Sequence, residues 1–523
     1  MHKTDFTRQY GSVMILFLMT LPVLFGLIGL AVDRTILYIV EAKLGAAADG
    51  AALGAGRLLG TPANPSEIAG EFLNANFPIG YWGTTNLQPS INYSLTSGLA
   101  TITVSASVQV PLIFLRVFRV NAATVYASAV ATRRTSRVVL VLDRSGSMNA
   151  TDPISGLNVF TEMQLGAESF AGMFTPGFDE VGLVVLSTSA MVAYPTTRPY
   201  NNSPTSSGGP DTSFDTTATT GPMMTQLQAM AAGGGTGTPE ALALAYIELQ
   251  KAHNRDYSLN GGIDNAQNSI VLFTDGVPDS IAVSPNIAAN DVVASSSPCK
   301  YKPASGTSNQ MMGTIAVPGN PGSWSSPFGL FLLSAYDTSN TLTWWLQNPG
   351  NGQAGSGDLV QSSPAAALTN CTGLGNNNNF VLSDLTQIPP YDIYNTSTSG
   401  SAYPQSTLDL PNGTSTQPYA GVAYDPTDLS SGNTGAIAAW NDTDNIGRTV
   451  RSQTNMQPVT IYTVGYSGDG GTDAVLLKRL ANTQDSTSYN SSQNSGFYIQ
   501  VNSADQLGAA FNTIAGQLLR LAK

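Results

Sequence analysis

Three oxygen-bearing side chains occupy alternate positions in one short turn of the chain: Asp143, Ser145 and Ser147. They directly follow the run 137–142, whose apolar and β-branched residues are typical of a strand covered on both faces. Side chains at alternate positions of a turn can point to one spot, and a carboxylate with two hydroxyls suits a hard cation such as Mg²⁺. The turn therefore indicates a divalent-metal site, although Asp and Ser also favour ordinary turns and helix caps.

Two further oxygen donors follow similar signals later in the chain. Thr236 comes directly after Gly234-Gly235, in a glycine-rich loop that lets the backbone approach closely just before a helix. Asp275 ends another buried apolar run. Thr238 is an alternative to Thr236, which we prefer because it adjoins the glycine pair. The run Ser-Gly-Asp-Gly-Gly at 467–471 could form a second cation loop, but it is more typical of a flexible turn.

An α/β domain from 136 to 521 would position these residues. Apolar runs that predict buried strands alternate with segments of helical spacing, an order that predicts a doubly wound, mainly parallel sheet. The predicted strands are 137–143, 181–188, 269–276, 458–467 and 496–501, and the predicted helices are 156–174, 238–253, 472–483 and 504–522. Open sheets of this kind bind ligands at the carboxyl ends of their strands, where Asp143 and Asp275 both lie.

In this order, the five residues resemble the metal-ion-dependent adhesion site of von Willebrand factor A (VWA) domains, which have a Rossmann-like fold. That resemblance implies that Ser145, Ser147 and Thr236 bind the cation directly, and that Asp143 and Asp275 hold it largely through water. It also implies an open coordination position for a carboxylate on a partner protein. The cation would be Mg²⁺, with Mn²⁺ or Ca²⁺ as alternatives.

Residues 12–32 carry no charge and are numerous enough to span a bilayer as a helix. We expect an uncleaved anchor rather than a cleaved signal peptide, although the alanines at 46–48 could serve as a cleavage site. Lys3 and Arg8 precede the run, against Arg34 after it, which favours a cytoplasmic N-terminus and an exported remainder, in a bacterial inner membrane. The helix continues into an Ala-rich stretch whose small residues allow close helix–helix contact.

The N-terminal 60 residues resemble those of TadG-like Tad (Flp) pilus-assembly proteins. The features are Gly11-Ser12, Leu21-Pro22 within the apolar helix, the run 29–33 (Gly-Leu-Ala-Val-Asp) and the Ala-rich stretch 46–56. A segment of helical spacing and several alternating strands then predict a small α+β module at 61–135, before the main domain.

A long insertion at about 281–430 interrupts the main domain and contains both cysteines, Cys299 and Cys371. Two cysteines without a neighbouring His do not make a zinc site. In an oxidising compartment they could form a disulfide that ties a small subdomain, and two free thiols are the alternative. The insertion is either such a subdomain or partly disordered.

Composition excludes two broad classes of function. The net charge is −12, which argues against nucleic acid as a partner because phosphate binding requires a basic surface. Only 11% of residues are charged, which is typical of exported proteins rather than cytosolic enzymes. The two histidines are His2, in the N-terminal tail, and His253, which we place at a solvated helix end, so a mechanism with a His base is disfavoured.

We therefore expect no enzyme, and two functions remain. In the first, a membrane-anchored protein of Tad/Flp pilus assembly or envelope adhesion binds a partner carboxylate through its metal. In the second, the chain is a scaffold or minor component of the pilus machinery, and the metal only stabilises the fold.

Overall fold

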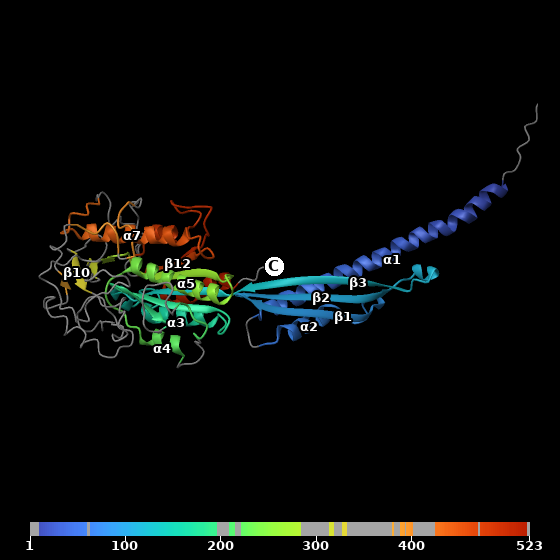
Figure 1. The fold of residues 1–523 in the computed structure, drawn as a ribbon, viewed down its shortest axis with the longest axis horizontal. Coiled ribbons are helices and arrows are strands. Elements are labelled where there is room, and N and C mark those ends of the chain that lie inside the picture. Colours follow the sequence, from blue (N-terminus) through green and yellow to red (C-terminus); the bar gives the residue numbers. More distant parts are fainter. Residues whose placement is uncertain are drawn as a thin grey trace, which may run out of the picture. The chain divides into compact units, whose positions relative to one another are not determined.

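The computed structural model describes residues 10–59, 63–195, 209–214, 221–283, 313–317, 327–331, 379–380, 387–392, 394–400, 424–468 and 471–519 (Figure 1). The chain forms two compact units, which adjoin in the sequence between Arg134 and Thr135.

The first unit combines one long helix, α1 (Tyr10–Gly56), with a short helix, α2 (Pro65–Asn76), and an antiparallel sheet in the order β1-β2-β3. The strands are β1 (Thr85–Thr96), β2 (Leu99–Pro111) and β3 (Ala122–Arg134). Alternate residues of β2 are buried, as expected of a sheet with one covered face.

The two halves of α1 have different surroundings. From Met14 to Leu30 most of the large apolar side chains are exposed, and α1 is long and apolar enough to cross a membrane. From Val40 to Ala55 one face of the helix is buried, and it packs against α2 and β3. The Ala-rich stretch therefore packs within its own unit. Gly54 shows how closely, since a Cβ there would lie 2.9 Å from the ring of Phe72.

The second unit is built on a six-stranded sheet in the order β13-β12-β7-β4-β5-β6, which is parallel except for the antiparallel edge strand β6. Its strands are β4 (Ser136–Asp143), β5 (Glu180–Leu186), β6 (Ala190–Tyr194), β7 (Gln267–Thr274), β12 (Thr460–Tyr466) and β13 (Tyr498–Val501). The expected doubly wound, mainly parallel sheet is confirmed, and β6 is an addition.

Helices cover both faces of this sheet (Figure 1). They are α3 (Val159–Gly172), α4 (Pro222–Ala229), α5 (Thr238–Leu259), α7 (Gly432–Arg451), α8 (Ala474–Leu480) and α9 (Leu507–Leu518). α3 packs with α9 and α5 packs with α7. β4 lies inside the sheet, and all eight of its residues are buried. Each fully buried aliphatic side chain contributes roughly 1.5–3 kcal/mol to the stability of the fold, so β4 is a main part of the core.

Part of the long insertion forms a second, antiparallel sheet in the order β11-β10-β9-β8. The strands are β8 (Ser280–Val283), β9 (Gly313–Ala316), β10 (Phe328–Phe331) and β11 (Asn379–Phe380). Cys299 and Cys371 lie outside the described residues, so the disulfide stays a prediction.

Candidate metal centre

The turn after β4 is fixed by the Asp143 carboxylate. In the parallel register Leu142 pairs with Phe273, so β4 and β7 end at the same edge of the sheet. One oxygen of Asp143 accepts the backbone N–H of Ser145 at 2.7 Å, and the other accepts the hydroxyl of Thr274 at 2.5 Å. Asp143 is fully buried, so its carboxylate has a fixed position. Its bond to the Ser145 N–H then sets the start of the turn that carries the two serines.

Three oxygen atoms converge beyond that turn. The hydroxyl oxygens of Ser145 and Ser147 lie 3.0 Å apart, and each lies near the same carboxylate oxygen of Asp275, at 3.3 and 3.0 Å. Ligands of an octahedral Mg²⁺ at about 2.1 Å from the ion lie about 3 Å from one another. The two serine hydroxyls of this oxygen triangle therefore have the spacing of neighbouring ligands of one Mg²⁺, with the Asp275 carboxylate beside them.

Hydroxyls have to contribute to any cation site at this edge. Within the described ranges, no three His, Cys, Asp or Glu side chains gather in a way that could hold a metal. Ser147 and Gly146 are exposed, whereas Asp143, Ser145 and Asp275 are buried. The triangle thus meets solvent on the side of Ser147, which is where an outside ligand could enter.

The glycine-rich loop brings Thr236 to the same edge. The backbone of this loop is hydrogen-bonded to the turn after β4. Gly233 N–H donates to the carbonyl of Arg144 at 2.7 Å, and Gly146 N–H donates to the carbonyl of Gly234 at 2.9 Å. The hydroxyl of Thr236 lies 3.1 Å from where a Cβ on Gly276 would stand, next to Asp275 in the sequence. Thr236 therefore lies against the Asp275 loop.

Thr238, the alternative ligand, is the first residue of α5. Its hydroxyl is buried and has no hydrogen-bond partner among the described residues. No described contact joins this hydroxyl to the oxygen triangle. The proposed second cation loop at 467–471 falls partly outside the described residues.

Asp279 holds the glycine-rich loop in place, and the sequence did not predict this role. Its carboxylate accepts the backbone N–H of Thr236 at 2.6 Å, and its own N–H donates to the carbonyl of Thr236 at 3.1 Å. A Cβ on Gly235 would lie 2.7 Å from this carboxylate, which explains the glycine. The one available signal was an acidic residue four positions after Asp275.

Three buried carboxyl groups lie at this edge of the sheet: Asp143, Asp275 and Asp279. Burial raises the pKa of Asp143 and raises the pKa of Asp275 well above its usual range, and the neighbouring charge of Asp143 raises that of Asp275 further. Burial also raises the pKa of Asp279 to about 7, against the opposing hydrogen bond from Thr236. A divalent cation would favour the ionised carboxylates and reverse these shifts.

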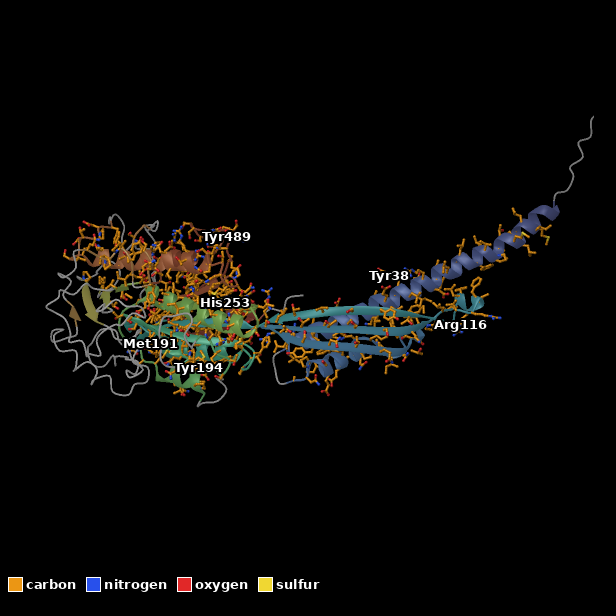
Figure 2. All side chains as sticks on the ribbon, viewed as in Figure 1. Tyr38, Arg116, Met191, Tyr194, His253 and Tyr489 are labelled. Atoms are coloured by element: carbon orange, nitrogen blue, oxygen red, sulfur yellow. The ribbon has the colours of Figure 1, made fainter. Side chains whose placement is uncertain are left out.

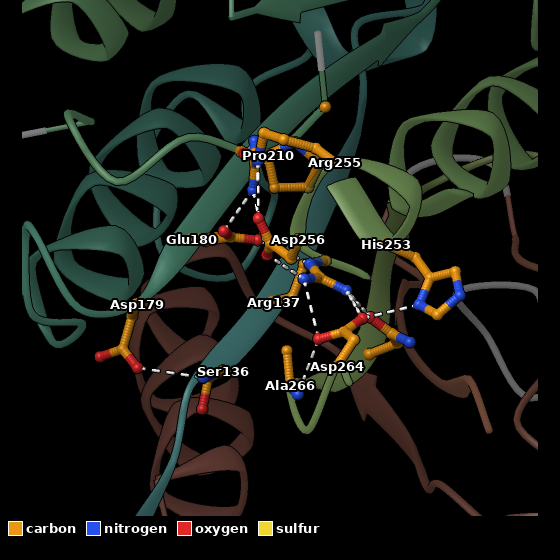
Figure 3. A network of polar contacts seen from close by, with 12 residues as sticks. Ser136, Arg137, Asp179, Glu180, Pro210, His253, Arg255, Asp256, Asp264 and Ala266 are labelled. Atoms are coloured by element: carbon orange, nitrogen blue, oxygen red, sulfur yellow. Dashed lines mark hydrogen bonds and ion pairs between the residues drawn. The ribbon is translucent and has the colours of Figure 1, made fainter. Parts of the chain in front are cut away.

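A second polar network lies at the opposite, amino end of β4, as Figure 3 shows. The buried Arg137 guanidinium bonds Glu180 at 2.6 Å, Asp256 at 2.5 Å and Asp264 at 2.9 Å. His253 bonds Asp264 at 2.7 Å and is largely buried within α5, so our placement of it at a solvated helix end was wrong. Arg137, Arg255 and His253 each bond a carboxylate, and Asp179 accepts the backbone N–H of Ser136, an arrangement that is typical of a structural network.

Comparisons with known proteins agree with both parts of the sequence reasoning. Residues 138–277 match the von Willebrand factor type A domain family, and residues 11–58 match the Flp pilus-assembly TadE/G-like family. The search of curated proteins found no match.

Several solved structures show remote similarity. The PilB minor pilin from Streptococcus sanguinis is 12% identical, with 84% of this chain and 79% of that chain covered and a TM-score of 0.32. The von Willebrand factor type A protein from Catenulispora acidiphila is 11% identical, with 83% and 50% covered and a TM-score of 0.31. The vWF domain of the type V pili tip protein Mfa5 from Porphyromonas gingivalis is 14% identical, with 74% and 97% covered and a TM-score of 0.29.

Proposed function

Because the chain joins a TadE/G-like N-terminal segment to a VWA domain, we propose that it is a membrane-anchored binding protein of Tad/Flp pilus assembly or envelope adhesion. The VWA domain would hold Mg²⁺, or in its place Mn²⁺ or Ca²⁺, and the cation would bind a carboxylate of a partner protein. The partner would be a pilus-assembly component or another envelope protein. This is a binding function and not an enzymatic one.

The observation that carries the proposal is the oxygen triangle of Ser145, Ser147 and Asp275, open to solvent on the side of Ser147. The hydroxyls of Ser145, Ser147 and Thr236 would ligate the cation directly, and Asp143 and Asp275 would hold it largely through water. Neutral hydroxyls leave most of the ion's charge uncompensated. The cation would therefore attract a carboxylate from outside, which is the chemistry that adhesion requires.

The anchor would be α1, with the N-terminus in the cytoplasm and both folded units outside it. The uncharged run 12–32 and the exposed apolar side chains from Met14 to Leu30 support this arrangement. In spheroplasts, added protease should digest the chain beyond about residue 60, whereas protection of that region in intact membranes would contradict the topology.

Partner capture tests the binding function against the scaffold. Full-length protein in nanodiscs would be immobilised and exposed to envelope extract, with Mg²⁺ or with EDTA. We expect a captured protein to be lost in EDTA, to return with Mg²⁺ and to be displaced by excess acetate. The Asp143→Ala variant should not capture it, while Asp425→Ala, a change at an exposed carboxylate, should behave as wild type.

One result would favour the scaffold instead. If a folded, metal-free Asp143→Ala protein captured the same partner as wild type, the metal would have no part in recognition. The metal site would then only stabilise the fold.

A further inference from the structure

The loop between β2 and β3 exposes an unusual amount of apolar surface. Residues 112–121 form a tight loop that is closed by a hydrogen bond from Leu112 N–H to the Asn121 carbonyl at 3.0 Å. Soluble surfaces rarely keep so many large apolar side chains together. The exposed ones, with their exposed fractions, are Ile113 (59%), Phe114 (40%), Val117 (82%), Phe118 (69%) and Val120 (46%).

Asp33 of α1 fixes this loop to the anchor helix. Its carboxylate, in a residue only 1% exposed, accepts three consecutive backbone N–H groups: Ile113 at 2.9 Å, Phe114 at 3.1 Å and Leu115 at 2.8 Å. Figure 2 shows the result, with Arg116 at the tip of the loop beside α1. The position of the loop along α1 is therefore set by hydrogen bonds within one unit.

The contact of Phe114 with Gly29 shows how far the loop reaches along the apolar part of α1. A Cβ on Gly29 would lie 2.6 Å from Cβ of Phe114, so the phenylalanine packs directly on the helix backbone. Gly29 precedes Asp33 by one helical turn, or about 6 Å at 1.5 Å per residue. Gly29 belongs to the uncharged run 12–32, so the loop overlaps the apolar part of α1 by at least one turn.

Most of the backbone N–H groups of the loop have acceptors within the unit, which favours entry into a bilayer. Besides the three N–H groups that bind Asp33, Val117 N–H donates to Phe114 at 3.2 Å and Arg119 N–H donates to Arg116 at 2.9 Å. Val120 N–H donates to Leu115 at 3.2 Å. The apolar side chains can therefore leave water without burying these polar groups unpaired.

We propose that residues 112–121 enter the membrane beside α1, in the leaflet nearest the first unit, and fix the depth and tilt of the anchor. The inference rests on the proposed membrane anchor. These exposed apolar side chains contact lipid, because they lie beside the apolar part of α1, which would cross the membrane. Arg116 and Arg119 are both exposed and alternate with these side chains, an arrangement that lets long basic side chains reach lipid phosphates while their stems stay in apolar surroundings.

Photo-crosslinking in native membranes tests this placement. The full chain would carry p-benzoylphenylalanine in place of Phe118 or, in a second variant, Val117, and adducts would be identified by mass spectrometry. The same probe replacing Phe17, exposed on the apolar part of α1, reports whether α1 spans the bilayer. The same probe replacing Tyr126, exposed on β3 beyond the loop, is the control outside the membrane.

We expect lipid adducts at 118 and 117 with a yield comparable to that at 17, and none at 126. Lipid adducts at 17 combined with only protein adducts at 117 and 118, whether a second copy or another component, would overturn the inference and leave the anchor intact. An absence of lipid adducts at all positions, including 17, would overturn the anchor and the inference together.

Discussion

At the scale of single residues, hydrogen bonds from Thr274 and to Asp279 hold the oxygen donors at the carboxyl edge of the sheet. Asp143 and Asp275 follow apolar runs that predict buried strands of one parallel sheet, whose carboxyl ends lie at the same edge, and the pairing of β4 with β7 brings them close. Thr274 ends β7 and orients Asp143, and Asp279 in the loop after β7 orients Thr236. Side-chain hydrogen bonds of this kind leave no periodic signal in the sequence.

The Gly235→Ala change tests whether the glycine loop positions a ligand. The added Cβ would stand 2.7 Å from the Asp279 carboxylate, so the loop must shift and carry Thr236 with it. We expect Mn²⁺ affinity to fall by roughly 10- to 100-fold, as for other changes that displace a ligand's support. Titration calorimetry on the full-length protein measures this directly.

Gly508→Ala is the matched control for that change, since a Cβ at Gly508 of α9 would meet nothing within 4 Å. It should leave Mn²⁺ affinity unchanged. Equal affinity in Gly235→Ala and wild type would remove Thr236 and its loop from the proposed site.

At the scale of elements, strands and amphipathic helices were predictable, and the helix α7 was not. α7 buries Asn441, Asp442 and Asp444 together with its apolar residues, so polar side chains also lie on its covered face. Its polar side chains find tertiary partners instead: Arg479 bonds Asp444 at 2.8 and 2.6 Å, and Asn441 bonds the carbonyl of Thr398 at 3.4 Å. Such tertiary partners become identifiable only once the fold is known.

The Arg137→Met change tests whether the network at the amino end of β4 is structural. Removing the guanidinium leaves the buried Glu180 and Asp264 without their shared cation, which should cost about 3–5 kcal/mol of the unfolding free energy. Chemical denaturation of the full chain provides the measurement. Lys478→Met, which removes the exposed pair with Asp485, should cost about 1 kcal/mol or less.

The folded Arg137→Met protein should still bind Mn²⁺, since Arg137 lies near the start of β4 and Asp143 is its last residue. A stability equal to that of wild type would show that the network contributes little. Loss of metal binding without unfolding would instead assign it a functional role.

The buried carboxyl of Asp392 predicts a pH dependence of stability in the segments 387–392 and 394–400, the second of which bonds α7 through Asn441 and Asn445. Burial raises its pKa from 3.8 to about 7, and one of its oxygens has no hydrogen-bond partner among the described residues. A raised carboxyl pKa favours the folded state below the unfolded value, and this contribution is lost as pH rises through the folded value. The unfolding free energy should therefore decline between about pH 4 and about pH 7.

The Asp392→Asn variant removes this contribution, together with the effect of the Asp392 charge on the pKa of the buried Asp442. Its amide oxygen can still accept the N–H groups of Tyr394 and Thr396. Denaturation of both proteins in chelator across this pH range should give a flatter profile for the variant. Parallel profiles for the two proteins would mean that Asp392 does not titrate with folding.

At the scale of the whole molecule, α1 belongs both to the apolar segment and to the first folded unit. Cleavage at the alanines 46–48 would remove Asp33, Val40 and Leu44, and with them the bonds to the β2–β3 loop and part of the buried core. We therefore expect the mature protein to retain residues 33–48. Intact mass and N-terminal sequencing of protein from membranes would show this, and a mature N-terminus just after 46–48 would identify a signal peptide.

The binding of Mn²⁺ to the full-length protein tests the central claim most directly. Calorimetry should find one site per chain, weakened sharply and about equally by Asp143→Ala and by Asp275→Ala. The double variant should be little worse than either single one, because both carboxylates serve one ion. Asp425→Ala should match wild type. A folded wild-type protein that binds no divalent cation at millimolar concentration, or binding that survives both substitutions, would contradict the metal site and the function proposed from it.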